Sequence, residues 1–232
     1  MSGLNLSSVG YTGSLLGGVV AGPATGPTMP ALNWLTRFSA DTGLVNQVSG
    51  GPNLTVAAGS TPATVSNAYG TRAAWSLNLA NPDYFSLSLV NAVAQHLLVA
   101  FVVTQSAFGA FGSMILSSNT SSPATYDQLT SSGCYIQNVL VGYNFPLNVP
   151  LAVVAYIGTD GAARMWVNGS ITVGAAATAI SAQTIAWQIG HYGGGNNWNY
   201  GGLIAAHCIA GGAYTDTDAA NVGTAMRSYY GI

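Results

Sequence analysis

The sequence predicts an all-β protein, an antiparallel β-sandwich with a short C-terminal helix and an extended N-terminal arm. From Leu32 onward, short apolar runs alternate with clusters of Gly, Pro, Asn, Asp and Ser, which is the pattern of a sandwich or a barrel. One helical pattern stands near the C-terminus, and Gly, Ser, Pro and Thr dominate the first residues. No charged linker divides the chain, so we expect one folded domain, residues 31–232, preceded by an arm of residues 1–30.

The arm is the first element. Gly22-Pro23 and Gly26-Pro27 interrupt any regular structure there, and free arms of this composition are normally disordered. Apolar side chains along the arm are expected to anchor it by packing on the domain or on a neighbouring subunit. We therefore expect the arm to serve assembly or attachment through Leu4, Leu6, Val9, Tyr11, Leu15 and Leu16.

The candidate strands follow, each an apolar or alternating run bounded by turn residues. Their ranges are 32–38, 53–58, 73–79, 84–90, 96–104, 112–117, 134–142, 150–157, 162–167, 170–174, 184–189 and 202–210.

Residues 150–174 form the clearest group, a three-stranded meander. Its first turn is Gly158-Thr159-Asp160-Gly161, and its second, Asn168-Gly169, suits the type I′ turn of a two-residue hairpin. Neighbouring residues of a strand point to opposite faces. Arg164 and Trp166 are therefore expected on one face, and Met165 and Val167 on the other.

The helix comes last. Thr215 or Asp216 can cap its N-terminus, and Asp218 lies in the first turn, where negative charge is favourable. Val222, Met226 and Tyr229 are spaced to form one apolar stripe, and Gly231 ends the helix.

Charged side chains are scarce in this chain. It has four arginines, six aspartates, no lysine and no glutamate, which is 4% charged residues against about 25% in ordinary domains. General acid–base catalysis needs such groups, and nucleic-acid binding needs clustered Lys or Arg. We therefore expect that the protein is not an enzyme and that it has no nucleic-acid partner. A net charge of −2 does little to keep copies apart, so we expect a homo-oligomer, with a trimer as one form to test.

Membrane and export signals are weak. The longest apolar run, residues 97–103, is a strand, because a spanning helix needs about 20 residues. The start at Met1 lacks the positive region of a signal peptide, so we expect no membrane partner and synthesis in a cytoplasm without export. Cys134 and Cys208 are expected to be buried free thiols, because a disulfide framework needs more cysteines.

The chain resembles a laminin-G, or concanavalin A-like, jelly-roll domain, most clearly in its last third. The resemblance runs over residues 31–230 and is carried by short motifs in the right order. They are Leu32-Asn33-Trp34-Leu35 with Asp41-Thr42-Gly43, Arg164-Met165-Trp166-Val167-Asn168-Gly169, Ile189-Gly190, Tyr200-Gly201-Gly202-Leu203-Ile204, and Thr215-Asp216-Thr217-Asp218-Ala219.

The resemblance implies a jelly roll and several kinds of function. Its family includes calcium-assisted lectins, glucanases, cell-adhesion modules and viral structural proteins, including proteins of tailed-bacteriophage virions. The glucanases need a strand with paired glutamates, and this chain has no glutamate. Two aspartates could replace them. However, Asp41, Asp83, Asp127 and Asp160 all lie in segments that read as turns.

The loop 191–200 is the most site-like segment. Aromatic rings can stack on the apolar faces of a sugar, and amides can bond its hydroxyls. We expect a partner subunit or a glycan to contact Trp198, Tyr192, Asn196, Asn197 and Asn199. Tyr200, in contrast, is expected to anchor the next strand.

We expect no metal and no cofactor. His207 and Cys208 are strand neighbours that face opposite sides, so they cannot easily share an ion. Asp216 and Asp218 are better explained as helix-capping residues than as calcium ligands.

These observations favour a non-enzymatic structural subunit of a bacteriophage virion: a capsid decoration protein, a head fibre or a small tail-associated protein. Its partners would be capsid or tail subunits, and its location the virion, after synthesis in the host cytoplasm. Two alternatives stay open. One is a carbohydrate-binding adhesin or receptor-binding module that uses the loop 191–200, and the other is a glycoside hydrolase, which needs two carboxylates about 5–10 Å apart.

Overall fold

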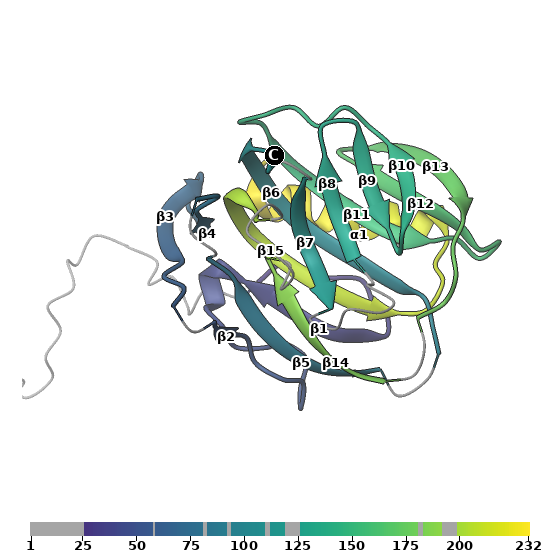
Figure 1. Cartoon of the computed structure of the whole chain (residues 1–232), viewed down its shortest axis with the longest axis horizontal. Coiled ribbons are helices and arrows are strands. Elements are labelled where there is room, and N and C mark those ends of the chain that lie inside the picture. Colours follow the sequence, from purple (N-terminus) through teal and green to yellow (C-terminus); the bar gives the residue numbers. More distant parts are fainter. Residues whose placement is uncertain are drawn as a thin grey trace, which may run out of the picture.

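The structure is a computed structural model, and it describes residues 26–57, 59–80, 83–91, 94–109, 112–118, 126–180, 183–191 and 199–232. It confirms the predicted fold class. Two antiparallel sheets form a sandwich, and one helix, α1 (Asp216–Tyr230), lies near the C-terminus (Figure 1).

Sheet A has eight strands, and β15 is its organising strand. One edge of β15 pairs with β6 along its whole length, while the other edge pairs first with β4 and then with β1. A register shift in β15 between Ile204 and Ala206 marks this change of partner. In spatial order the strands are β13 (Ser170–Ala176), β12 (Ala162–Val167), β11 (Pro150–Ile157), β6 (Leu97–Ala107), β15 (Gly201–Gly211), β4 (Arg72–Leu77) and β3 (Ala63–Tyr69), with β1 (Trp34–Ser39) also beside β15.

Sheet B has seven strands, all paired antiparallel to their neighbours. In spatial order they are β10 (Val139–Gly142), β9 (Gly133–Ile136), β8 (Tyr126–Thr130), β7 (Ser113–Ser118), β14 (Gln183–Ile189), β5 (Phe85–Asn91) and β2 (Thr55–Val56). A short 3-10 helix, η1 (Ala40–Thr42), follows β1.

Three strand predictions differ from the structure. The single strand predicted for 134–142 is a hairpin, because Gln137 and Asn138 adopt positive φ angles of 47° and 70° and turn the chain between β9 and β10. Strands β3 and β8 were not predicted. The first five residues of β3 are exposed, and β8 reads Tyr-Asp-Gln-Leu-Thr, so neither shows the apolar run that marks a strand.

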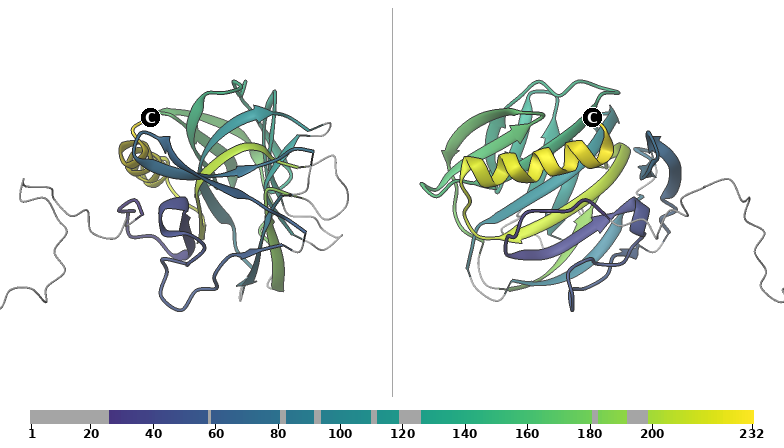
Figure 2. Two further views of the ribbon diagram at one scale, coloured as in Figure 1. Left: turned by 90° about the vertical axis from the view of Figure 1, so that its left-hand side faces the viewer. Right: turned by 180° about the vertical axis from the view of Figure 1, so that it is seen from behind.

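The core has two layers, one on each face of sheet A. Between the sheets lie large apolar side chains such as Phe38, Phe101 and Trp187. On the other face, Trp166 and Tyr156 of sheet A pack against Val222, Met226 and Tyr230 of α1. Figure 2 shows α1 lying across the back of the sandwich. The helix therefore covers the outer face of sheet A.

The meander is confirmed in register and in facing. Asn168 and Gly169 have φ angles of 46° and 109°, as a type I′ turn requires, and they join Val167 to its partner Ser170. Met165 belongs to the core between the sheets and Trp166 to the core under α1.

The helix ends are also confirmed. Thr215 and Asp218 form a capping box, and Gly231 adopts a left-handed φ of 68°. The predicted stripe is confirmed: Val222 and Met226 are buried, and Tyr229 packs half-buried against the same core. Tyr230 is buried as well, and its hydroxyl donates to the Ala205 carbonyl over 2.9 Å.

Both cysteines are buried free thiols, as predicted. Cys134 lies between the sheets and Cys208 on the helix side of sheet A, so the two occupy different layers. Burial raises the pKa of both thiols. Among the described residues, α1 is too short and too polar to count as a membrane-spanning helix.

Candidate functional site

The structure describes only the two ends of the loop predicted to bind a partner or glycan. Tyr192, Asn196, Asn197 and Trp198 lie outside the described residues, as do the arm residues Leu4, Leu6, Val9, Tyr11, Leu15 and Leu16. His191 and Asn199, at the base of the loop, are described.

Asn199 holds the loop closed at its base. Its side chain is fully buried, and its Nδ2 donates to the Leu79 carbonyl over 3.1 Å. Its Oδ1 lies 2.6 Å from Nδ1 of His191. Because the Asn199 amide uses its N–H toward Leu79, Oδ1 is the acceptor and His191 carries its proton on Nδ1. These two hydrogen bonds give Asn199 a positioning role at the base of the loop.

His191 is fixed from three further directions. Its ring stacks on Tyr84 with 4.5 Å between ring centroids, and its carbonyl accepts from the Ser117 hydroxyl over 2.6 Å. The adjacent Gly190 carbonyl accepts from the Tyr200 amide over 2.8 Å. Tyr200 is fully buried, with its hydroxyl bonded to the Leu203 carbonyl, so its predicted anchoring role is confirmed.

A groove of ≈ 260 Å³ opens on the outer face of sheet B, next to this loop base. Alternation along β5 creates it: Phe85, Leu87 and Leu89 are buried in the core, while Ser86 and Ser88 point outward. On either side of these serines lie Asn53, Thr55, Ala186 and Gln188. Pro52, Leu87 and Trp187 complete the lining, so the groove wall combines small hydroxyl and amide side chains with apolar surface.

Gln188 is the central residue of this groove. In the sheet register it stands between Ser86 of β5 and Ser117 of β7. Gln188 is only 5% exposed, and its Oε1 has no hydrogen-bond partner among the described residues. A buried acceptor without a donor costs about 1–3 kcal/mol. Gln188 thus holds a buried, unpaired acceptor at the lining of the groove, three residues before His191.

The groove is electrically neutral. All ten charged side chains lie within the described residues, and none of them lines it. The six carboxylates are each bonded elsewhere: Asp41 to the Ala73 amide and the Tyr229 hydroxyl, Asp83 to the Thr61 amide, Asp127 to the Gln137 amide, Asp160 and Asp216 to Arg164, and Asp218 to the amide and hydroxyl of Thr215.

Asp127 and His207, which both lie in the core, are among the groups whose pKa values are strongly shifted. Burial raises the pKa of Asp127 to about 7, and the Gln137 amide partly offsets this. Burial lowers the pKa of His207 to about 3, and the backbone of Ile115 partly offsets it. Neither side chain lines the groove.

The metal predictions can be compared with side-chain placement. His207 and Cys208 do face opposite sides of sheet A, as expected. Asp218 caps α1, while Asp216 accepts from the Tyr156 hydroxyl over 2.9 Å and pairs with Arg164. Within the described ranges, no three His, Cys or Asp side chains come together in a metal-binding group.

Sequence reasoning missed the groove residues Thr55, Ser86, Ser88 and Gln188. The available signal was the Phe-Ser-Leu-Ser-Leu alternation of β5, which predicts a strand with one small, polar face. What that face adjoins depends on pairing with β14 and β2, which lie far away in sequence.

A scan of protein-family models finds no match to this chain, and neither does a search of curated proteins. Solved structures with the same fold are found at low identity. Domain 4 of AbnA, a GH43 extracellular arabinanase from Geobacillus stearothermophilus solved with arabinotriose, has a TM-score of 0.62 at 15% identity over 83% of this chain and 98% of its own.

Two further neighbours are larger than this chain. The binding domain of Paraclostridial Mosquitocidal Protein 1 has a TM-score of 0.62 at 10% identity, over 85% of this chain and 52% of its own. Trypanosoma rangeli sialidase has a TM-score of 0.55 at 12% identity, over 84% and 33%. The chain therefore spans about half of the toxin domain and a third of the sialidase, and together these likenesses identify its fold as a β-sandwich of the lectin-like, jelly-roll kind.

Proposed function

We propose that this chain is a non-enzymatic binding module that recognises a neutral, hydroxyl-rich ligand, a carbohydrate, in the groove of sheet B. The observation that carries the proposal is the unpartnered, buried Oε1 of Gln188 in a groove of serine, threonine and asparagine side chains. Sugar hydroxyls both donate and accept, so they match such a wall, whereas a charged ligand would find no counter-charge there.

The structural neighbours support this class of function. One of them was solved with arabinotriose, and another is described as a binding domain. The predicted loop residues Tyr192 and Trp198 follow the end of β14 by three and nine residues, and they would add aromatic stacking, which is how sugar faces are commonly held.

The placement of the carboxylates supports a binding role over hydrolysis. Glycoside hydrolysis uses two carboxyl groups across a substrate cleft. Here each of the six aspartates is bonded within the fold, and none lies in the groove.

A glycan array on the purified chain tests the proposal, followed by calorimetry with the best glycan. Replacing Gln188 with Leu removes the acceptor at similar size, and Ser86→Ala removes one neighbouring hydroxyl. Both should weaken binding, Gln188→Leu by about tenfold. Ser66→Ala, on the exposed strand β3, is the matched control and should bind as wild type. The proposal fails if no glycan binds, or if Gln188→Leu binds unchanged.

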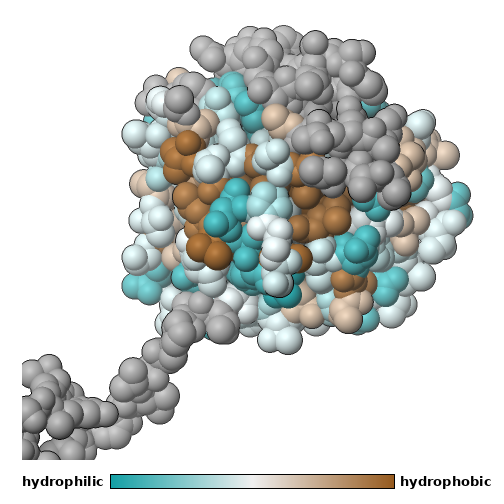
Figure 3. Space-filling view, turned by 90° about the horizontal axis from the view of Figure 1, so that it is seen from below, coloured by the Kyte–Doolittle hydropathy of each residue, from teal (hydrophilic) through white to brown (hydrophobic). Residues whose placement is uncertain are grey.

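A second candidate, a structural subunit of a bacteriophage virion, concerns where such a module would act. The surface favours it. Only 4% of residues are charged, and large apolar side chains such as Val45 (59% exposed) and Val173 (55% exposed) reach solvent. Seen from below, hydrophobic patches alternate with hydrophilic ones (Figure 3). A surface of this kind suits packing against capsid or tail subunits, or against copies of itself.

Light scattering of the purified chain and peptide mass spectrometry of purified virions test this candidate. A homo-oligomer, such as a trimer, together with a fixed number of copies per particle, would support it. A monomer that is absent from particles would contradict it, and would leave the glycan proposal standing.

A further inference from the structure

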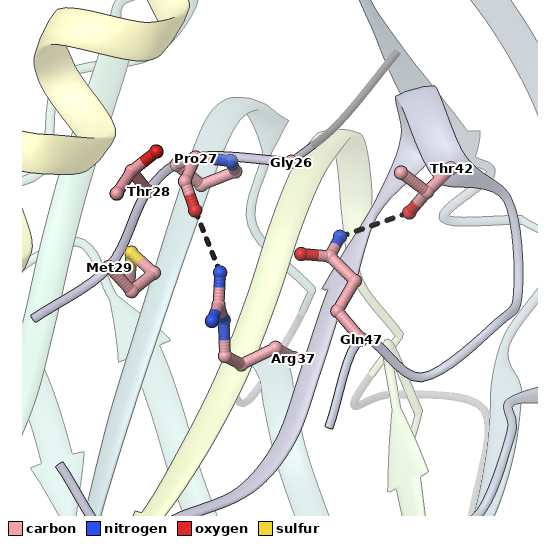
Figure 4. Close-up of a pocket in the computed structure, with 7 residues that line it drawn as sticks. All are labelled: Gly26, Pro27, Thr28, Met29, Arg37, Thr42 and Gln47. Atoms are coloured by element: carbon pink, nitrogen blue, oxygen red, sulfur yellow. Dashed lines mark hydrogen bonds between the residues drawn. The ribbon is translucent and has the colours of Figure 1, made fainter. Parts of the chain in front are cut away.

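A second hollow lies beside β1 and shares no residue with the groove (Figure 4). Its volume is ≈ 540 Å³, within the range of about 300–1,000 Å³ usual for small-molecule sites. Residues 26–29 pass over one side of it. Arg37, Thr42 and Gln47 form the other walls.

Arg37 is the only charged residue lining this hollow, and its hydrogen-bonding capacity is largely unused. A guanidinium has five N–H donors. Among the described residues, its guanidinium donates only to the Pro27 carbonyl, over 2.7 Å from Nη2, and its Cζ lies 6.0 Å from the centroid of the Trp34 ring. Its Nε is buried and has no hydrogen-bond partner within the described part of the chain.

The other three arginines are better satisfied. Arg164 pairs with Asp160 and Asp216. Arg72 lies 3.8 Å from the centroid of the Tyr229 ring, and Arg227 donates to the carbonyls of Asn168 and Ile232.

No carboxylate of the chain compensates the charge of Arg37. Asp41, which follows it by four residues, accepts instead from the Ala73 amide and the Tyr229 hydroxyl, over 2.8 and 3.0 Å. The remaining aspartates, all within the described residues, are bonded elsewhere. Arg37 is therefore a cation without a counter-ion at the wall of an open hollow.

Gln47 supplies the second polar group. Its Nε2 donates to the Thr42 hydroxyl over 3.0 Å, which leaves Oε1 as a free acceptor. In Figure 4 this oxygen points across the hollow toward the Arg37 side. Pro27 and Met29 add apolar surface.

We infer that this hollow binds a small carboxylate whose carbon body carries hydroxyl groups, such as a sugar acid. The planar guanidinium of Arg37 matches a carboxylate, and Oε1 of Gln47 would accept from a ligand hydroxyl. One cation suits a monoanionic carboxylate, whereas a phosphate dianion calls for more positive charge than this hollow holds.

Calorimetry with glucuronate, glucose and acetate tests the inference on the full chain. Glucuronate should bind, and Arg37→Met should weaken that binding by at least about tenfold, because a charge-assisted bidentate contact is lost. Arg227→Gln removes the same charge outside the hollow and should bind as wild type. Raising the salt to about 1 M should weaken binding to wild type.

Further variants make each outcome decisive. If Arg37→Met fails to fold, two other variants test the same contacts. Arg37→Lys keeps the positive charge but loses the planar guanidinium that binds a carboxylate with two hydrogen bonds, and Gln47→Leu removes the acceptor. Each should still weaken glucuronate binding. No binding of glucuronate to wild type, or equal binding to Arg37→Met, would overturn the inference. Equal affinity for acetate would overturn the part that concerns the hydroxylated body.

One comparison distinguishes glucuronate binding in this hollow from binding in the groove on sheet B. Gln188→Leu should leave glucuronate binding unchanged if Arg37 holds the carboxylate. A loss with Gln188→Leu and none with Arg37→Met would place glucuronate in the groove, which would reject this inference and support the proposed function.

Discussion

Gly223 of α1 lies directly against the indole of Trp166 on β12: a Cβ atom at position 223 would overlap the six-membered ring. The absent side chain lets the helix settle on sheet A with Trp166 only 3% exposed. Glycine inside a helix costs about 1 kcal/mol relative to alanine, so the contact must outweigh that cost.

We predict that Gly223→Ala destabilises the protein by about 1–2 kcal/mol, because forced overpacking costs about 1–3 kcal/mol and the gain in helix propensity offsets part of it. Chemical denaturation measures this change. Thr224→Ala, at the exposed neighbouring position, is the control and should be neutral or slightly stabilising. A more stable Gly223→Ala would show that the helix can lift off Trp166 at little cost.

Asp127 should make the protein less stable as pH rises. Its folded pKa of about 7 lies above the ordinary 3.8, so the folded state keeps a proton that the unfolded chain releases between these values. Stability from this group is therefore lost from about pH 4 to pH 7. Asp127→Asn removes the titration and should raise stability at pH 8 by about 1 kcal/mol or more. Denaturation at pH 4 and pH 8 tests this; an unchanged difference between the two would contradict it.

His207 should act in the opposite direction. Its folded pKa of about 3 lies below the ordinary 6.5, so the unfolded chain gains a proton between these values while the folded state does not. Stability from this group is lost as pH falls from about 6.5 to 3. His207→Leu should therefore remove this loss of stability at acidic pH.

The contributions of Asp127 and His207 to stability change with pH in opposite directions between about pH 4 and pH 6.5. The wild-type profile should be nearly flat there. Asp127→Asn should reveal a slope that rises with pH, and His207→Leu a slope that falls. Parallel profiles in the two variants would show that other groups control the pH dependence.

Two substitutions in the loop 191–200 should distinguish a residue that positions the loop from a residue that contacts the ligand. Asn199→Ala should destabilise the fold by about 1–3 kcal/mol, because it leaves the Leu79 carbonyl and His191 without their buried partner. Trp198→Ala should change stability by less than about 1 kcal/mol and weaken binding of the glycan or partner subunit by about 2 kcal/mol. Thermal melts and binding assays on both variants measure this. A large stability loss in Trp198→Ala would identify the indole as a core residue.

Local patterns in the sequence determined the meander and the helix of this protein. Asn168-Gly169 specifies its turn because two successive positive φ angles suit these residues. The alternation of Arg164, Met165 and Trp166 assigned each side chain to a face, since the strand period is two. The Thr215–Asp218 pair and Gly231 set the ends of α1 through hydrogen bonds within four residues.

Only the tertiary structure decided which of those faces meet. Strands β3 and β8 escaped prediction because pairing with a neighbour, rather than apolar content, makes them strands. Gln188 lies between Ser86 and Ser117 because β14 pairs with strands that lie about 100 and 70 residues earlier in the chain. Arg37 borders a hollow because residues 26–29 fold back over β1. Such contacts depend on long-range register and packing, which a local sequence pattern does not encode.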